Sequence, residues 1–501
     1  MHEKLDELRA RLRDVTDLEM AGAVLDWDQQ TYMPRGGAVA RGRQMATLAR
    51  IRHEKFTDPA LGHLLDALAP YADTLGADSD DAALIRVTQR DYDRALRIPP
   101  TLLVAFYEHS ASMYEAWVDA RPTGDFRPLT DGFARTVDFS RQFAACAPSY
   151  DHIADPLIDA ADYGMRAVDI QRIFGELRAR LVPLVERVTA HERPDTRFLG
   201  RDYPAATQLA LALQLGTQFG YDTQRGRQDL THHPFATRFS NGDVRITTRV
   251  NPHDPTDALF STLHECGHAM YEQGVAAHYD GTLLASGVSA GVHESQSRLW
   301  ENLVGRSRAF CAYAFPQIQA AFPQQLAGVT AEQWYRAVND VSRSLIRTDA
   351  DELTYNLHVI IRFDLELALL DGSLAPRDLP DAWRARYQRD LGVASPDDKD
   401  GVLQDVHWYA GVVGGSFQGY TLGNILSAQF YNAAVQTHPQ ITTEVAHGEF
   451  GTLHGWLREN VYQHGRKYTP TELIARASGQ PMTIEPYIAY LEAKYGELYP
   501  A

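Results

Sequence analysis

The feature that most constrains this chain is a His-Glu-x-x-His pattern at His264, Glu265 and His268, set within a helical stretch. In an α-helix, residues four apart lie on one face, so the two histidines can bind one divalent ion from the same side. Glu265 then points in an adjacent direction, where it can act as a general base beside the ion. The pattern predicts a catalytic metal site; the simpler alternative is a chance match on an ordinary amphipathic helix.

We expect the helix around this pattern to begin near residue 255 and to end at Gly274. Asp254 or Thr256 can cap its first turn, and Pro255 is compatible with a first turn because those N–H groups lack helical partners. A glycine is typical of a helix stop. One face of this helix is apolar and is expected to be buried: Ala258, Leu259, Thr262, Leu263 and Cys266.

A third ligand must come from another segment. Glu272 is excluded, because it would lie about 12 Å along the helix axis from His264. Glu294 follows His268 by 26 residues (294 − 268), which leaves room for a reversing loop and a second, antiparallel helix. Two histidines and one glutamate leave a fourth position open to water, as in catalytic zinc sites.

Two rivals of Glu294 as third ligand lie on the same predicted helix. His293 projects about 100° away from Glu294 on a helix. Glu301 lies two turns further along the same face, where it can support a ligand or cap the core instead. We therefore predict His264, His268 and Glu294 as the metal ligands.

The chain resembles the carboxypeptidase Taq family of metal-dependent carboxypeptidases. Besides the His-Glu-x-x-His pattern, the resemblance rests on five blocks in the family's order: residues 233–235, 243–247, 293–296, 346–351 and 401–408. Similarity at residues 26–29 and in the C-terminal helices extends it over nearly the whole chain. The resemblance implies a carboxypeptidase of broad specificity with limits on substrate length, and a homodimer.

The expected fold is mainly α-helical, with two lobes, a deep central cleft and a small antiparallel β-sheet beside the metal helix. Residues 238–250 alternate in polarity around an Asn241-Gly242 turn, which predicts a β-hairpin. No linker interrupts the chain, so we expect a single unit over 1–501, with a helical scaffold and lid in 1–200 and a catalytic part in 201–501.

Several further helices are expected in the C-terminal half. A strong helical pattern runs from residue 346 to 370, with Thr348 or Asp349 as its cap. Residues 401–424 are rich in glycine and loop-like. The closing helices are expected at 425–436, 452–463, 470–478 and 484–497.

Composition limits the partners. A formal net charge of −17 argues against binding to nucleic acid or to anionic membrane surfaces. No run approaches the roughly 18 apolar residues of a membrane span. The N-terminus lacks the apolar region of a signal peptide, and the three cysteines fit buried thiols, so we expect a reducing cytoplasm.

Four residues are predicted to contact the substrate. By resemblance, Arg347 pairs with the terminal carboxylate of a peptide, which suits a guanidinium; the alternative is a structural salt bridge to Asp351. His407 and Tyr420, in the glycine-rich stretch, are candidates for binding substrate or oxyanion, with core packing as the alternative. His233 is a candidate substrate contact, or else makes a structural hydrogen bond.

The predicted reaction is hydrolysis of the last peptide bond by metal-activated water, with Glu265 as the general base. Zn²⁺ is the first choice of cofactor, and this ligand set also accepts Co²⁺ or Mn²⁺. The substrates are peptides with a free C-terminal carboxylate. Two alternatives remain open: an oligopeptide endopeptidase on the same site, and a helical binding protein whose metal is structural.

Overall fold

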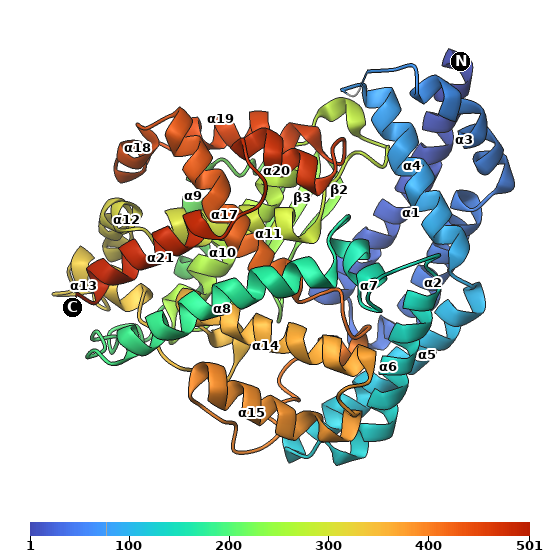
Figure 1. The fold of residues 1–501 in the computed structure, drawn as a ribbon. Helices are drawn as coiled ribbons and strands as arrows, with labels where there is room; N and C mark the ends of the chain where they lie inside the picture. The colour runs from blue at the N-terminus through green and yellow to red at the C-terminus, as the bar shows by residue number, and fades with distance from the viewer. Residues whose placement is uncertain (77, 501) are drawn as a thin grey trace.

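The computed structural model describes residues 1–76 and 78–500. These residues form 21 α-helices and three short strands, which confirms the mainly α-helical fold (Figure 1). The helices that precede the strands are α1 (His2–Thr31), α2 (Ala38–Phe56), α3 (Pro59–Ala72), α4 (Asp80–Arg97), α5 (Pro100–Ala120), α6 (Thr130–Ala145), α7 (Asp155–Ala161), α8 (Ala167–Thr189) and α9 (Ala205–Phe219).

The sheet contains β1 (Gln228–Leu230), β2 (Ala236–Ser240) and β3 (Asp243–Thr248), in the order β1-β3-β2. Strands β2 and β3 pair antiparallel, which confirms the predicted hairpin. Strand β1 pairs parallel to β3, so the sheet is mixed and the expectation of an antiparallel sheet was incomplete. A strand of three residues is too short to show alternation, which explains why the sequence did not predict it.

In the described part of the chain, twelve more α-helices follow the strands, together with a π-helical turn at Leu299–Val304. They are α10 (Pro255–Gly274), α11 (Ala290–Arg298), α12 (Arg308–Ala321), α13 (Ala331–Val338), α14 (Glu352–Asp371), α15 (Leu379–Leu391), α16 (His407–Ala410), α17 (Gln418–Thr437), α18 (Ile441–His447), α19 (Gly451–Asn460), α20 (Pro470–Ser478) and α21 (Glu485–Leu498).

The metal helix α10 has the predicted bounds, with Asp254 as its cap: the Asp254 side chain accepts a hydrogen bond from the Thr256 N–H at 2.9 Å. Helix α14 begins later than predicted, at Glu352. Its cap is Asp351, which accepts two backbone N–H groups of the first turn at 3.0 Å each, so the prediction of a cap at residue 348 or 349 was wrong.

Helix α17 begins at Gln418, seven residues before the predicted start at 425. Gly419 and Gly423 lower the helix propensity of its first turns, which explains the error. Gly423 has a packing reason, because a Cβ there would come within 2.4 Å of the Glu294 Cγ. The closing helices α19, α20 and α21 lie close to their predicted places, whereas α18 was not predicted.

Two hydrophobic clusters stabilise the fold. The smaller joins α1, α3 and α4 to the segment 275–285, and the larger extends from α5 to α21. The N-terminal helices α1 to α4 accordingly lie together at one side of the molecule in Figure 1.

The three cysteines are free thiols; Cys266 and Cys311 are buried as predicted, but Cys146 is half-buried because it follows the end of α6. Within residues 1–76 and 78–500, none of the helices combines the length and the apolar character needed to cross a membrane.

One buried acid links α14 to the loop after α16. The Glu366 side chain is 1% exposed, and its Oε1 accepts the Trp408 indole N–H at 2.8 Å and the Gly414 N–H at 3.0 Å. Burial raises the pKa of Glu366 from 4.5 to about 7, against the lowering effect of these two donors and of Arg362. The folded protein therefore keeps a proton on this carboxyl at pH values where the unfolded chain has lost it.

This pKa shift predicts how stability changes with pH. Because the folded pKa lies above the unfolded value, the folded state binds more protons between them. Glu366 should therefore lower the unfolding free energy by roughly 3 kcal/mol as pH rises from about 4.5 to about 7. Glu366→Gln keeps an acceptor at Oε1 and should lose this decline, so its stability relative to the parent should rise with pH in denaturant titrations. Parallel curves for the two proteins would contradict the assignment.

Candidate metal centre and cleft

Helices α10 and α11 pack closely, and α11 also packs against α17. The two backbones approach closely at Gly267, inside the His-Glu-x-x-His pattern: a Cβ there would come within 2.5 Å of the Gln296 carbonyl oxygen and 2.6 Å of the Ser297 Cα. The first turn of α11 is capped by Ser289, whose side chain accepts the Val292 N–H. This packing sets the face of α11 that bears Glu294 against the two histidines.

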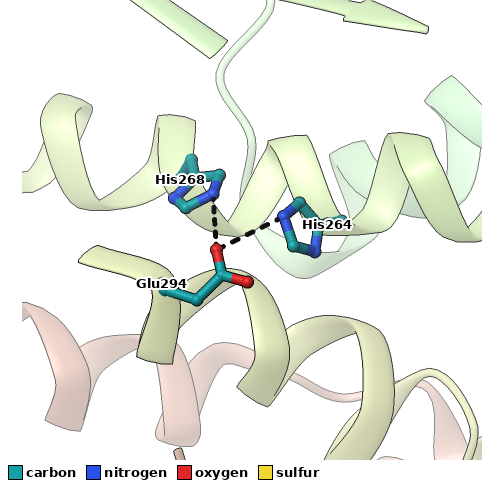
Figure 2. A group of neighbouring side chains, drawn as sticks. All are labelled: His264, His268 and Glu294. Carbon is teal, nitrogen blue, oxygen red and sulfur yellow. Dashed lines mark ion pairs between the residues drawn. The ribbon is translucent and has the colours of Figure 1, made fainter. Parts of the chain in front are cut away.

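The three predicted ligands lie together (Figure 2). The Glu294 Oε2 is 3.6 Å from the His264 Nε2 and 3.3 Å from the His268 Nε2, and all three atoms lie within 4.8 Å of one another. In a tetrahedral site with bonds of about 2.05 Å, two ligand atoms are about 3.3 Å apart. The spacing and the chemistry of these donors therefore fit a divalent ion.

Glu301 lies behind His264 and is not among the grouped donors. Its Oε2 is 2.9 Å from the His264 Nδ1, so His264 donates its Nδ1–H there and keeps the Nε2 lone pair for an ion. Burial would raise the pKa of Glu301, but Arg298 and His264 lower it to about 2, so it stays an acceptor. The position of Glu301 thus agrees with one of the alternatives from the sequence, in which Glu301 supports a ligand instead of binding the ion.

Arg298 also neutralises Glu294. Its Nε donates to the Glu294 Oε1 at 2.7 Å, and its Nη1 donates to Glu301 at 3.2 Å. Burial opposes ionisation of Glu294, but Arg298 and the two histidines hold its pKa well below the usual range. The other rival ligand, His293, lies 2.6 Å from the His268 Nδ1, on the side of that ring opposite Glu294.

Glu265 differs from the other carboxylates of this cluster. It lines the cleft, is 5% exposed, and forms none of the ion pairs found among residues 1–76 and 78–500. Burial raises the pKa of Glu265 to about 7; His264 opposes this shift, and the negative charges of Glu294 and Glu301 add to it. A carboxyl with this pKa can both accept and release a proton near neutral pH.

We refer to His264, His268 and Glu294 as the metal group. It lies in the wall of a cleft of about 1120 Å³, which agrees with the expected deep cleft. His233, Arg347 and Tyr420 also line this cleft. His407 does not: it lies behind Tyr420, with its Nε2 3.4 Å from the Tyr420 hydroxyl. A sequence pattern cannot predict which of two neighbouring aromatic side chains faces a cleft.

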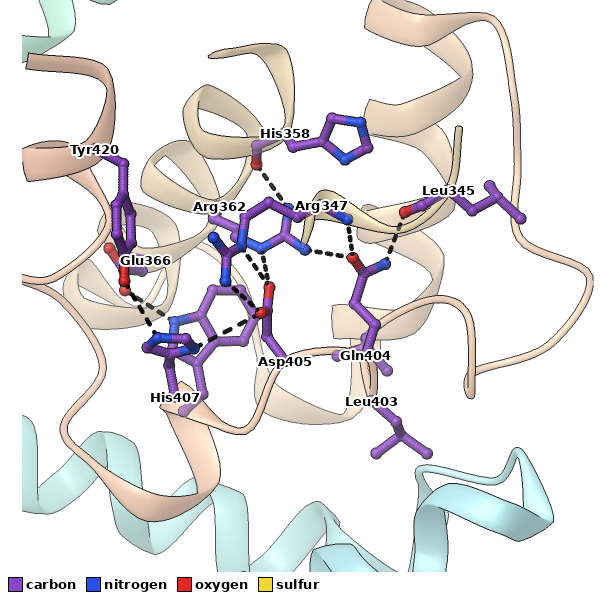
Figure 3. A network of polar contacts seen from close by, with 12 residues as sticks. Leu345, Arg347, His358, Arg362, Glu366, Leu403, Gln404, Asp405, His407 and Tyr420 are labelled. Atoms are coloured by element: carbon purple, nitrogen blue, oxygen red, sulfur yellow. Dashed lines mark hydrogen bonds and ion pairs between the residues drawn. The ribbon is translucent and has the colours of Figure 1, made fainter. Parts of the chain in front are cut away.

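Arg347 lies in a network of polar contacts (Figure 3). Asp405 accepts its Nε–H at 3.1 Å and one Nη2–H at 2.8 Å, and Tyr355 lies 3.0 Å from Nη1. Arg362 donates to the same Asp405 carboxylate at 2.6 Å. The alternative of a salt bridge to Asp351 was therefore wrong, because Asp351 caps α14 and the acid that binds Arg347 is Asp405.

Asp405 and Arg362 were missed by sequence reasoning. Asp405 lies in one of the blocks that support the resemblance, but its partner Arg347 lies 58 residues away. Arg362 lies within a helix that the sequence predicts to have an apolar face, and the structure shows its side chain to be fully buried. The only available signal was a charged residue within the apolar run 359–363, which suggests a buried partner but does not identify it.

A mainly helical fold, with a His-Glu-x-x-His helix in a cleft wall and a glutamate from the next helix, defines the class of the metallopeptidases. The sequence profile of the carboxypeptidase Taq (M32) metallopeptidases matches residues 7–495. This protein therefore belongs to the carboxypeptidase Taq (M32) family and is a metallocarboxypeptidase.

Three relatives illustrate the match. The chain is 41% identical to thermostable carboxypeptidase 1 of Thermus thermophilus and 34% identical to carboxypeptidase 1 of Bacillus subtilis, over 97% of each chain in both pairs. The crystal structure of the M32 carboxypeptidase from Deinococcus radiodurans R1 is 54% identical, covers 100% of both chains and superposes with a TM-score of 0.97. The family and its fold thus extend over the full length.

Proposed function

We propose that this metallocarboxypeptidase releases single amino acids from the free C-terminus of peptides, with broad specificity, using one divalent ion at His264, His268 and Glu294. The observation that supports this most directly is the close grouping of these three donors beside an unpaired Glu265 in the cleft wall. Zn²⁺ is the ion we expect first, because imidazole and carboxylate donors suit it, and Co²⁺ or Mn²⁺ can replace it.

Glu265 moves the proton in the proposed reaction. A divalent ion, when bound, supplies Lewis acidity that polarises the scissile carbonyl and activates water. Glu265 takes up the proton of the attacking water on its carboxylate and then passes it to the leaving amine nitrogen. A pKa of about 7 suits both steps.

Arg347 is the proposed partner of the substrate carboxylate. A guanidinium has five N–H donors; Asp405 accepts two and Tyr355 lies against a third, so two donors on Nη1 and Nη2 are left (5 − 3 = 2). These can bind a carboxylate in a bidentate manner. Asp405 at the same time fixes the orientation of the guanidinium, which reduces the entropy lost on binding.

Tyr420 is the proposed donor to the oxyanion. It lines the cleft, and its ring lies 5.1 Å from the Arg347 guanidinium carbon. Burial raises the pKa of the Tyr420 hydroxyl, so it stays protonated and able to donate. His407 acts through Tyr420 in this proposal, and the exposed His233, which lines the same cleft, contacts the substrate.

The proposed homodimer finds support in the outer face of α5, which lies near the edge of the molecule in Figure 1. Its buried face includes Phe106 and Met113. The exposed face bears an apolar stripe with the 3-4-3-4 spacing of a helix-packing seam: Val104, Tyr107, Ala111, Tyr114 and Val118. We refer to these five residues as the α5 stripe.

The α5 stripe has almost the same order of side chains in both directions. Two antiparallel copies related by a two-fold axis would therefore match valine with valine and tyrosine with tyrosine on either side of the central alanines. The small Ala111 at its centre allows the two helices to approach closely. Four large apolar side chains on one exposed helix face would otherwise remain in water.

Replacing Glu265 with Gln tests the proton-transfer role. The variant keeps the volume of the side chain and leaves the three proposed ligands intact, so it should retain the metal. We expect its turnover to fall by at least about a thousandfold, as for loss of a principal catalytic group. Metal content and steady-state hydrolysis would be measured on the same preparation. Near-normal turnover in the metal-loaded variant would exclude Glu265 as the base.

A pair of peptides, one with a free C-terminal carboxylate and one amidated, tests the exopeptidase proposal. Mass spectrometry should show stepwise loss of single residues from the free peptide only, and a chelator should stop the reaction without unfolding the protein. Arg347→Lys keeps one charge but loses the bidentate geometry, and should lower kcat/KM for the free peptide about 10- to 100-fold. Internal cleavage of both peptides would favour the endopeptidase; a folded, metal-loaded but inactive protein would favour a structural metal.

The dimer proposal predicts that one substitution in the α5 stripe converts the dimer into a monomer. The parent should have about twice the chain mass of 56.0 kDa by light scattering after gel filtration. Ala111→Arg places a long charged side chain at the centre of the α5 stripe and should give a monomer with an unchanged melting temperature. Val39→Arg, on the exposed face of α2, is the matched control and should stay dimeric. A monomeric parent, or a dimeric Ala111→Arg variant, would refute this interface.

A further inference from the structure

A chain of polar contacts lies behind His268, on the side of its ring opposite the proposed metal. The His268 Nδ1 is 2.6 Å from the His293 Nδ1, and the His293 Nε2 is 2.9 Å from the Glu272 Oε1. The Glu272 Oε2 lies 3.1 Å from the Nε of Arg238, on strand β2. Glu272 is 7% exposed and also accepts the Gly287 N–H at 3.0 Å, so the far end of the chain is held from several elements.

The direction of each hydrogen bond follows from the chemistry of the groups. A carboxylate between a guanidinium and a backbone N–H is an acceptor, so the His293 Nε2 must bear a proton and donate to Glu272. A neutral His293 with its proton on Nε2 has a lone pair on Nδ1. That lone pair can only accept, so the His268 Nδ1 bears a proton and the His268 Nε2 lone pair is free.

The other arrangement would close the site to a cation. If His293 bore protons on both nitrogens, the His268 Nδ1 would have to accept, and the His268 proton would move to Nε2. That proton would then point at the Glu294 Oε2, 3.3 Å away. Only a neutral His293 oriented by Glu272 leaves a metal-binding lone pair on His268.

We propose that His293, oriented by Glu272, is a positioning residue that fixes the tautomer and ring orientation of His268. This inference rests on the proposed metal-dependent function. It gives a role to His293, which was a rival candidate for the third ligand. In the dipeptide His293-Glu294, Glu294 is the proposed ligand and His293 supports a second ligand, His268. His268 is thereby backed by a neutral imidazole, whereas His264 is backed by the Glu301 carboxylate.

A matched pair of variants tests the hydrogen bond separately from packing. Asn and Leu have nearly the same shape, but an Asn side chain can place its amide oxygen near the position of the His293 Nδ1, where it accepts a hydrogen bond. Leu fills the same space without an acceptor and leaves the His268 Nδ1–H unpaired. His293→Asn should therefore rescue what His293→Leu loses.

The primary readout is metal affinity, measured by competition for Zn²⁺ with a chromophoric chelator and without any peptide. We expect His293→Leu to bind Zn²⁺ about 10- to 100-fold more weakly than the parent, the typical loss when a partner of a metal ligand is removed, and His293→Asn to stay within about threefold. The visible absorption spectrum of the Co²⁺-loaded protein should change in His293→Leu and stay parent-like in His293→Asn.

Thermal melts of the metal-free proteins show whether each variant folds. Tyr271→Phe is the control for loss of a neighbouring hydrogen bond: it keeps the ring that lies 5.2 Å from that of His293, removes only the hydroxyl that accepts the Val288 N–H, and should keep the parent affinity. Parent-like Zn²⁺ affinity in His293→Leu would overturn the inference, as would equal weakening in the Leu and Asn variants, which would indicate ring packing alone. A parent that binds no Zn²⁺, Co²⁺ or Mn²⁺ would refute the proposed function itself.

Discussion

The close packing of α11 between α10 and α17 is the constraint on which the metal group depends. Two glycines permit it: Gly267 lies against the backbone of α11, and Gly423 lies against the Glu294 side chain. Metal ligation tolerates errors of only about 0.2 Å in bond length. Any side chain at either glycine would push Glu294 away from the histidines. The His-Glu-x-x-His pattern on α10 is therefore not sufficient for the metal group, because the packing of α11 places the third donor.

Burying several acids at one place is the electrostatic cost of this arrangement. Arg298 offsets much of it, because one guanidinium contacts both Glu294 and Glu301. A divalent ion would add two positive charges to the same cluster. Glu265 has no ion pair with Arg298, and its pKa is raised because the carboxyl is buried without such a partner. Arg298 thus distinguishes the two acids that it contacts, Glu294 and Glu301, from Glu265, the proposed proton-transfer acid.

The sequence predicted those parts of the site that depend on local geometry. Spacing of four on a helix placed His264 and His268 on one face, and the 26-residue separation from Glu294 allowed a helix pair. Contacts between distant segments were not predictable in this way. Arg347 and Asp405 are 58 residues apart, and the support of His268 by His293 depends on how α11 is rotated against α10. The late start of α14 was not predicted because several neighbouring residues could cap the helix and Asp351 is the one that does. Strand β1 was not predicted because its three residues are held by pairing with another segment, β3.

The charge balance around Arg347 gives the proposed exopeptidase activity a physical basis. Arg347 and Arg362 share the single carboxylate of Asp405, so this buried network has one net positive charge (two guanidinium groups, one carboxylate). A peptide with a free C-terminal carboxylate would neutralise that charge on entering, which favours binding in a site screened from water. An amidated peptide, or an internal segment, would leave the charge unpaired and would also desolvate it. The discrimination then comes as much from the penalty for the wrong end group as from the hydrogen bonds to the right one.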